Sequence, residues 1–288
     1  MRAVLRHELQ THFTSLTAYV FGAFLLLFAG IYTMVYNLQA GYTNFEYVLG
    51  GISFIFLVIV PILTMRILAE ERRQRTDQLL YSLPLTTTGI VLGKYLSLLI
   101  VFALPLGIIS LYPIILSAFG NVYLPAAYAA IGGFFCLGAA LIAIGVYVSS
   151  VTESQAVAAG LCFVVMLVNY FIGDLSSYVS TSAFASLAAL VVLALLACLV
   201  IYLMTKNGFA ALMTAAVLEA GLMALYLLKS ELFEGLFPNL MGELSLFERF
   251  YEIVNGVFDL TSIVYYLTVT GVFLFLTVQS MEKRRWSE

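Results

Sequence analysis

The chain has 288 residues and a formal net charge of −3; 62% of its residues are hydrophobic and 10% are charged. Too few polar side chains are present to cover such a chain in water, which excludes a soluble globular domain. Apolar runs of about twenty residues recur throughout, the length that an α-helix needs to cross the hydrocarbon core. Composition therefore predicts an all-α, polytopic transmembrane helical bundle, and the long unbroken runs argue against a β-barrel.

The first fifteen residues have the pattern of a helix that lies along the membrane surface. Their apolar residues recur at helical spacing, at Leu5, Leu9 and Phe13, and Leu16 continues the pattern. Charged and polar residues occupy the other positions, so residues 1–15 are predicted to form an amphipathic elbow helix at the cytoplasmic interface. His7 and His12 are five residues apart and fall on different sides of such a helix. We interpret them as interfacial residues and expect no metal site.

Apolar stretches predict eight membrane spans, with a topology of six spans as the alternative. The expected spans are 16–38, 47–68, 92–119, 124–150, 155–173, 183–204, 208–228 and 260–280. Pro105 and Pro113 predict a kinked or partly re-entrant third span. In the alternative, residues 183–228 form a helical hairpin that does not cross the membrane, and six spans remain.

The basic residues predict the orientation. With both termini in the cytoplasm, eleven of the thirteen Lys and Arg residues lie inside: Arg2, Arg6, Arg66, Arg72, Arg73, Arg75, Lys94, Lys206, Lys283, Arg284 and Arg285. Only Lys229 and Arg249 then lie outside. The localisation expected from this pattern is a multi-pass protein of the inner or plasma membrane.

A charged segment between the second and third spans, residues 69–91, is predicted to be a cytoplasmic loop with a helical start. The stretch from Arg66 to Lys94 holds five of the thirteen basic residues and three of the sixteen acids. Helical spacing places Ile67 and Leu68 at an interface and turns the acids and arginines towards the cytoplasm. Acidic residues contribute little to topology, so their presence indicates a surface that docks a protein.

Two further features are candidate functional elements. Glu219 lies near the middle of the expected span 208–228, where an ionisable residue is costly and normally faces a protein interior or a wet cavity. Residues 230–259 form the one long extracytoplasmic connection. An amphipathic helix there has one apolar face, interpreted either as a connector that rests on the membrane or as a gate helix: Phe247, Phe250, Tyr251, Val254 and Phe258.

Catalytic patterns are not found in the sequence. Neither histidine lies in a span, which argues against an intramembrane serine protease. Asp174 and Asp259 lie at span ends and do not form an aspartyl pair. The segment from Gly89 to Tyr95 is one residue too short between its glycines for a phosphate-binding loop, and Tyr follows its Lys. We expect no enzymatic activity and no cofactor bound by this chain.

The charged loop resembles that of type-2 ATP-binding-cassette (ABC-2) permeases. From Glu70 it reads E-E-R-R-Q-R-T-D-Q-L-L-Y-S-L-P-L, similar to the family's pattern of paired acids, Arg, Thr, Leu-Leu and S-L-P. From Phe247 the chain reads F-x-R-F-x-x-I-x-x-G-V-F-D-L-x-S-I-V-Y-Y-L, and it ends in E-K-R-R-W. These segments and the elbow helix resemble the gliding-motility-like branch of bacterial ABC transporters. The pair of helices at 183–228 departs from the family's usual six spans.

The resemblance implies one permease domain, residues 1–288, of an export-type ABC transporter. A separate ATPase, which binds ATP and Mg²⁺, would dock on the loop and drive the permease, working as a homodimer or with a second permease among membrane lipids. The residues that match the coupling motif are Glu70, Glu71, Arg72, Arg75, Leu79, Leu80 and Leu83. An ion-driven secondary transporter using Glu219, or a non-transporting scaffold, are the alternatives. No nucleic acid is an expected partner, and the sequence leaves the substrate undefined.

Overall fold

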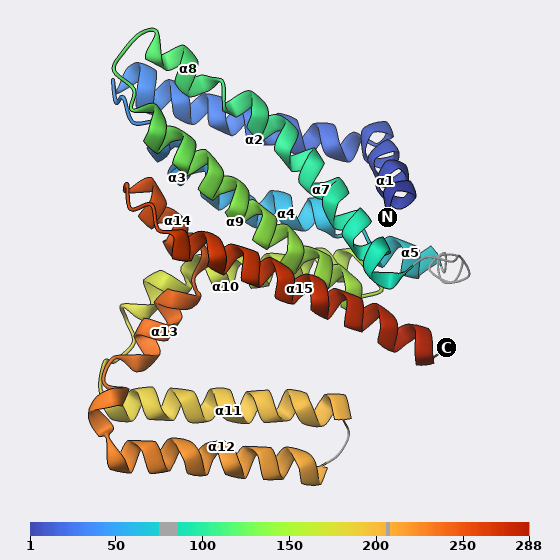
Figure 1. The fold of residues 1–288 in the computed structure, drawn as a ribbon, viewed down its shortest axis with the longest axis vertical. Coiled ribbons are helices and arrows are strands. Elements are labelled where there is room, and N and C mark those ends of the chain that lie inside the picture. Colours follow the sequence, from blue (N-terminus) through green and yellow to red (C-terminus); the bar gives the residue numbers. More distant parts are fainter. Residues whose placement is uncertain (75–85, 206–207, 288) are drawn as a thin grey trace. The chain divides into compact units, whose positions relative to one another are not determined.

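The computed structural model describes residues 1–74, 86–205 and 208–287, and every regular element in those ranges is a helix. The chain forms two compact units, Met1–Tyr170 with Leu246–Glu288, and Phe171–Ser245. The all-α polytopic bundle expected from composition is confirmed. Figure 1 shows the helices in chain order.

The first unit holds most of the long helices, and its elements up to Ser117 are as follows: α1 (Arg2–Thr14), α2 (Leu16–Thr33), the π-helix η1 (Met34–Gln39), α3 (Glu46–Ile52), the 3₁₀ turn η2 (Ser53–Ile55), α4 (Phe56–Thr64), α5 (Ala69–Gln74), α7 (Thr87–Ile109) and α8 (Tyr112–Ser117). The rest of this unit consists of α9 (Leu124–Val151), the first part of α10 (Gln155–Ser176), α14 (Leu246–Val254) and α15 (Leu260–Ser287). The second unit contains α11 (Ala183–Thr205), α12 (Gly208–Leu228), η3 (Ser230–Phe233) and α13 (Leu236–Leu244).

Six helices of the described ranges are long and apolar enough to cross a membrane: Leu16–Gln39, Glu46–Gln74, Thr87–Ser117, Leu124–Val151, Gln155–Ser176 and Leu260–Arg284. A seventh candidate is a bent pair, Leu212–Leu228 and Ser230–Leu244, with a bend of 116° between its two parts. Among the described residues this count agrees with the alternative of six spans, and the expected spans 183–204 and 208–228 are not among the six. The region 183–228 forms two packed helices, α11 and α12, as the departure from six spans suggested.

Proline breaks the third span where the sequence predicted irregularity. Pro105 lies inside α7, which ends at Ile109, and Pro113 stands in the first turn of the short helix α8. Since proline has no N–H to donate and favours the first turn of a helix, a turn at Ser110 and Leu111 interrupts the helix, which resumes as α8 within the same candidate span.

The core of the first unit is built around α9, which packs against α3, α4, α7, α14 and α15. Three buried rings pack together at its centre in edge-on and tilted arrangements, with ring centroids 4.6–6.2 Å apart: Phe56, Phe102 and Phe134. Gly138 makes this possible, because a Cβ there would lie 2.4 Å from the Phe102 ring. Small residues at helix crossings are typical of membrane bundles, where close backbone approach supplies the packing energy.

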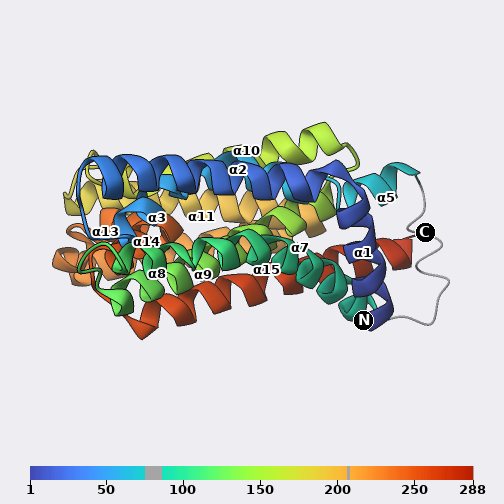
Figure 2. The same cartoon turned by 90° about the horizontal axis from the view of Figure 1, so that it is seen from above.

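The helices of this unit define two ends, visible in both views. At one end lie α1, α5 and the C-terminal part of α15, and at the other lie α3, α8 and α14 (Figures 1 and 2). We call them the α1 end and the α14 end.

Candidate functional site

A buried lysine joins three elements at the α1 end. Lys94, in the second turn of α7, is 1% exposed. Its Nζ donates hydrogen bonds to Oε1 of Glu71 at 2.6 Å, to Oε1 of Glu8 at 2.7 Å and to the carbonyl oxygen of Ile67 at 3.1 Å. An ammonium has three protons to donate, and a buried charge is costly unless it is paired, so this arrangement satisfies Lys94 completely.

The two carboxylates come from segments that the sequence keeps apart. Glu8 belongs to the elbow helix α1 and Glu71 to α5, the start of the charged loop. Their side chains are 12% and 23% exposed, so each reaches the surface while holding the lysine. Lys94 therefore fastens the elbow helix and the charged loop to the same turn of α7. We call Lys94, Glu8 and Glu71 the lysine cluster.

The elbow helix packs directly on α7 as well. Val4 is buried against Gly93, where an added Cβ would come within 3.1 Å of the Val4 side chain. Thr86 caps α7, because its Oγ1 accepts a hydrogen bond from the N–H of Gly89 at 3.2 Å. The first turns of α7 are thus fixed from both sides, and this positions Lys94.

Ser149 of α9 positions the start of α5. Its buried Oγ accepts hydrogen bonds from the N–H groups of Leu68 at 3.2 Å and Ala69 at 3.1 Å, and donates to the carbonyl oxygen of Met65 at 3.3 Å. The turn between α4 and α5 leaves these backbone groups without helical partners, and the serine supplies them. α5 is therefore tied to the bundle core by α9 and by the lysine cluster.

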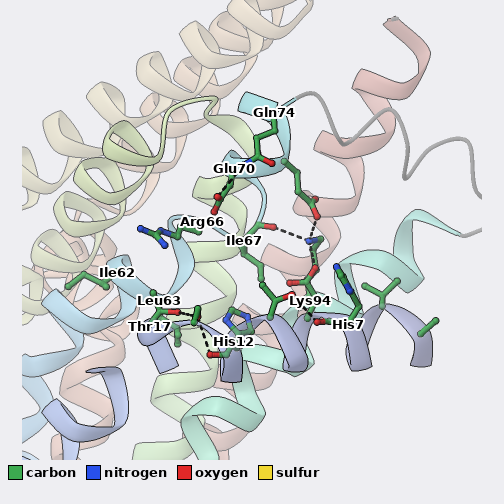
Figure 3. Close-up of a pocket in the computed structure, with 16 residues that line it drawn as sticks. His7, His12, Thr17, Ile62, Leu63, Arg66, Ile67, Glu70, Gln74 and Lys94 are labelled. Carbon is green, nitrogen blue, oxygen red and sulfur yellow. Dashed lines mark hydrogen bonds and ion pairs between the residues drawn. The ribbon is translucent and has the colours of Figure 1, made fainter. Parts of the chain in front are cut away.

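A cavity of about 700 Å³ lies beside the lysine cluster, between α1 and the segment from α4 to α5. His7 and His12 of α1, and Arg66 and Glu70 of the facing segment, are among its lining residues (Figure 3). The sequence analysis placed the two histidines on different sides of α1. Both nevertheless line the same cavity.

His12 is the more buried of the two histidines, and its environment shifts its titration. Burial lowers the pKa of His12 below the ordinary 6.5; Glu8 opposes this shift and Lys94 adds to it. Its Nε2 is buried and has no hydrogen-bond partner in the described residues. The imidazole is thus held in its neutral form at neutral pH.

The predicted coupling residues are only partly described. Glu70 is half-buried and accepts a hydrogen bond from Nε2 of Gln74 at 3.3 Å, and Arg72 is half-buried on the same helix. Glu71, expected to face the cytoplasm, is instead drawn inward by Lys94. The remaining four lie outside the described residues: Arg75, Leu79, Leu80 and Leu83.

The role of Lys94 is not apparent from the sequence, in which this lysine contributes to the predicted orientation and follows the glycine of a segment too short for a phosphate-binding loop. A signal was available. Lys94 stands two turns inside an apolar helix, and a buried lysine requires acidic partners. The sequence contained the acids but gave no means to choose among sixteen.

At the α14 end, the expected gate helix packs into the bundle. Phe247 and Phe250 are fully buried and Val254 is 5% exposed, all on the face that contacts α9 and α3. Tyr251 is half-buried, and its hydroxyl lies 2.9 Å from Oγ of Ser53. Phe258 was predicted on the same helical face, but α14 ends at Val254 and Phe258 is 59% exposed in the segment that follows. The apolar face is therefore covered by protein, which differs from a connector resting on the membrane.

Two hydrogen bonds fix the start of α14. The hydroxyl of Tyr266 donates to the carbonyl oxygen of Leu246 at 2.8 Å, and Oδ1 of Asn169 accepts from its N–H at 3.1 Å. Glu219, the other residue singled out by the sequence, lies half-buried on α12 in the second unit.

Comparison with known proteins agrees with this architecture. No curated protein matches the chain. Residues 14–206 match the family described as ABC-2 family transporter protein, which covers most of the six candidate spans. The matched segment includes α2, the charged loop and Lys94. The chain is a multi-pass membrane protein that belongs to the ABC-2 family of transporter proteins, and within an ABC transporter it is a membrane permease component.

Proposed function

We propose that this chain is the permease subunit of an ABC exporter that is driven by a separate ATPase docked at the α1 end. The observation that carries the proposal is the lysine cluster. A force applied to α5 by a moving ATPase reaches α7 through Glu71 and Lys94, and reaches the elbow helix through Glu8. A loop held in this way can transmit a displacement, because packed helices shift as rigid bodies.

The proposal places the α1 end, with both termini, in the cytoplasm. ATP and Mg²⁺ would bind to the ATPase subunit alone. The permease would act as a homodimer or with a second permease, since two ATPases close around ATP in this type of transporter. Glu70 and Arg72 are the described residues of α5 proposed to contact the ATPase, together with Arg75, Leu79, Leu80 and Leu83. Glu71 is assigned to the lysine cluster.

Co-purification tests this proposal. A tagged chain extracted from its native membrane in mild detergent is expected to retain an ABC ATPase, identified by mass spectrometry, and ATP hydrolysis sensitive to vanadate. Glu70→Arg reverses a charge on the proposed docking surface and should reduce ATPase retention about tenfold. Glu252→Arg is the matched control: it reverses an exposed charge on α14 and should retain the ATPase fully.

The outcomes separate the alternatives. A folded wild-type chain that never retains an ATPase would rule out the proposal, as would equal retention by Glu70→Arg and wild type. The ion-driven alternative depends on Glu219. We expect Glu219→Gln to leave ATP-driven transport and its pH dependence unchanged. A loss of pH dependence in this variant would favour the ion-driven alternative.

A further inference from the structure

A second cavity, of about 860 Å³, lies at the α14 end and has no part in the coupling proposal. Its walls are the start of α3, the N-terminal half of α9, and the end of α14 with the segment that leads to α15. All of these belong to the first unit. The volume falls in the range of about 300–1,000 Å³ that is typical of small-molecule sites.

Glycine and close packing shape this cavity. Gly132 of α9 lines it, and a Cβ added there would meet no atom within 4 Å, so the space beside it is open. The adjacent Gly133 is closed off, because its Cβ would lie 3.0 Å from Ile253 of α14. α14 thus closes the cavity beside Gly133, whereas the space beside Gly132 of α9 stays open.

The only formal charge on the described lining of the cavity is negative. Glu46 is the only acid or base among the described residues that line it, and it is 6% exposed. Its Oε1 accepts one hydrogen bond, from Nδ2 of Asn44 at 2.6 Å. The one hydrogen-bond partner of this carboxylate is neutral, and its position in the first turn of α3 supplies only the partial positive charge of a helix N-terminus. A full positive charge brought next to it would therefore be favoured.

Aromatic rings line the rest of the entrance. Tyr47, Tyr123 and Tyr128 belong to the lining and are 43%, 70% and 41% exposed, so a ligand can reach all three side chains. The hydroxyl of Tyr128 donates to the carbonyl oxygen of Ser110 at 3.1 Å, which holds that ring in place. The face of a tyrosine ring attracts cations, and aromatic cages combined with an acid are suited to organic ammonium groups.

We propose that this cavity binds a lipophilic cation: an organic molecule with an apolar body and one permanent or protonated positive charge. The apolar body would occupy the space beside Gly132, and the charge would lie between Glu46 and the tyrosine rings. An anion would be excluded by Glu46. This proposal does not depend on the proposed coupling to an ATPase, because binding of the cation needs neither an ATPase nor transport.

Tetraphenylphosphonium, which has four phenyl rings around one positive charge, is a suitable probe. The full chain would be reconstituted in nanodiscs of phosphatidylcholine, and binding of the tritiated probe measured by equilibrium dialysis, with empty nanodiscs subtracted for partition into lipid. We expect saturable binding. Glu46→Gln keeps the hydrogen bond from Asn44 but removes the charge, and should weaken binding about tenfold or more.

Three controls make the result specific. Glu252→Gln removes an acid from α14 that does not line the cavity and should bind the probe like wild type. Gly132→Leu fills the open space and should abolish binding, which keeps the proposal testable even if Glu46→Gln fails to fold. Tetraphenylborate has the same shape and the opposite charge, and should show no saturable binding.

The proposal is overturned by any of three results. One is the absence of saturable binding to the wild type, as expected if a second copy of the chain covers the cavity. Another is equal affinity of wild type and Glu46→Gln, which would make the charge irrelevant. The third is binding that survives Gly132→Leu, which would place the probe elsewhere. None of these outcomes bears on ATPase retention.

Discussion

Nζ of Lys94 lies 2.6 Å from Oε1 of Glu71, although 23 positions separate them in the chain. This contact joins α5, where the charged loop begins, to the helix that follows that loop. The lysine is fully buried and the glutamate reaches the surface. The pair therefore connects a segment accessible to another protein with the interior of the bundle.

Replacing Lys94 should destabilise the protein mainly by leaving its partners uncompensated. Lys94→Met keeps the apolar stem but removes the charge, so Glu8 and Glu71 lose their common donor. Loss of one partner of a buried ion pair costs about 3–5 kcal/mol, and the partial exposure of both acids reduces this to about 2 kcal/mol here. Thermal denaturation in detergent measures the change.

A triple variant provides the control for this mechanism. In Lys94→Met combined with Glu8→Gln and Glu71→Gln, no unpaired charge remains, so part of the lost stability should return. If the triple variant is no more stable than Lys94→Met alone, the stabilisation does not come from charge pairing.

The lysine cluster shows where sequence reasoning reaches its limit. Composition and apolar run lengths predicted the helical bundle, because a helix is the local solution for backbone polar groups in lipid. The irregularity at Pro113 and the extra helix pair at 183–228 could also be predicted from the sequence, since proline and the length of apolar runs are local signals. Helical periodicity indicates which face of α7 is buried, but it does not say which helices cover that face. Pairing Lys94 with Glu8 and Glu71 required the three-dimensional arrangement.

The same limit applies at the α14 end. The amphipathic pattern from Ser245 to Phe258 predicted a helix with one apolar face, which the structure contains as the shorter helix α14, Leu246–Val254. Whether lipid or protein covers such a face depends on the glycines opposite. Gly50 of α3 would place a Cβ 3.2 Å from Val254, and Gly133 of α9 would place one 3.0 Å from Ile253. Contacts between segments so far apart in the chain produce no periodic pattern of apolar residues from which they could be predicted.

Gly145 should be intolerant of the smallest side chain. An added Cβ would lie 2.4 Å from Oγ1 of Thr64 and 2.9 Å from its Cβ, so α9 and α4 would have to separate. Overpacking of this kind costs about 1–3 kcal/mol, and Gly145→Ala should lower the melting temperature accordingly. The matched control is Gly160→Ala on α10, where an added Cβ meets nothing within 4 Å. That variant should be neutral or more stable by up to about 1 kcal/mol. Equal effects at the two sites would contradict the packing described for Gly145.

His12 should make stability depend on pH in a narrow window. Burial holds its pKa in the folded chain below 6.5, so the unfolded chain binds the proton more readily. The contribution of the neutral imidazole is complete above pH 6.5, declines as pH falls from 6.5 to the lowered pKa, and is constant below that. Glu8, Glu70, Glu71, Arg66 and Lys94 are the charged groups that line the same cavity.

Melting temperatures between pH 5 and pH 8 test this prediction. His12→Gln removes the titrating group and should flatten the decline below pH 6.5. His7→Gln removes the exposed histidine of the same helix and should leave the wild-type profile unchanged. A decline that persists in His12→Gln would assign the pH dependence to another group.

The hydroxyl of Tyr266 should stabilise the start of α14 through the one hydrogen bond that it donates. Its hydroxyl is buried and donates to the carbonyl oxygen of Leu246, the first residue of α14, at 2.8 Å. Tyr266→Phe keeps the ring but leaves that carbonyl without this donor, which costs about 1–2 kcal/mol when the group is buried. Hydrogen–deuterium exchange should increase in residues 246–254, while the core of α9 stays protected.

Tyr128→Phe is the matched control. It loses an equivalent hydroxyl-to-carbonyl bond, to Ser110, at an exposed position where water can replace it. Its cost should stay below about 0.5 kcal/mol. If Tyr266→Phe behaves like Tyr128→Phe, the hydrogen bond to Asn169 and the packing of Phe247 and Phe250 are sufficient to hold α14 in place.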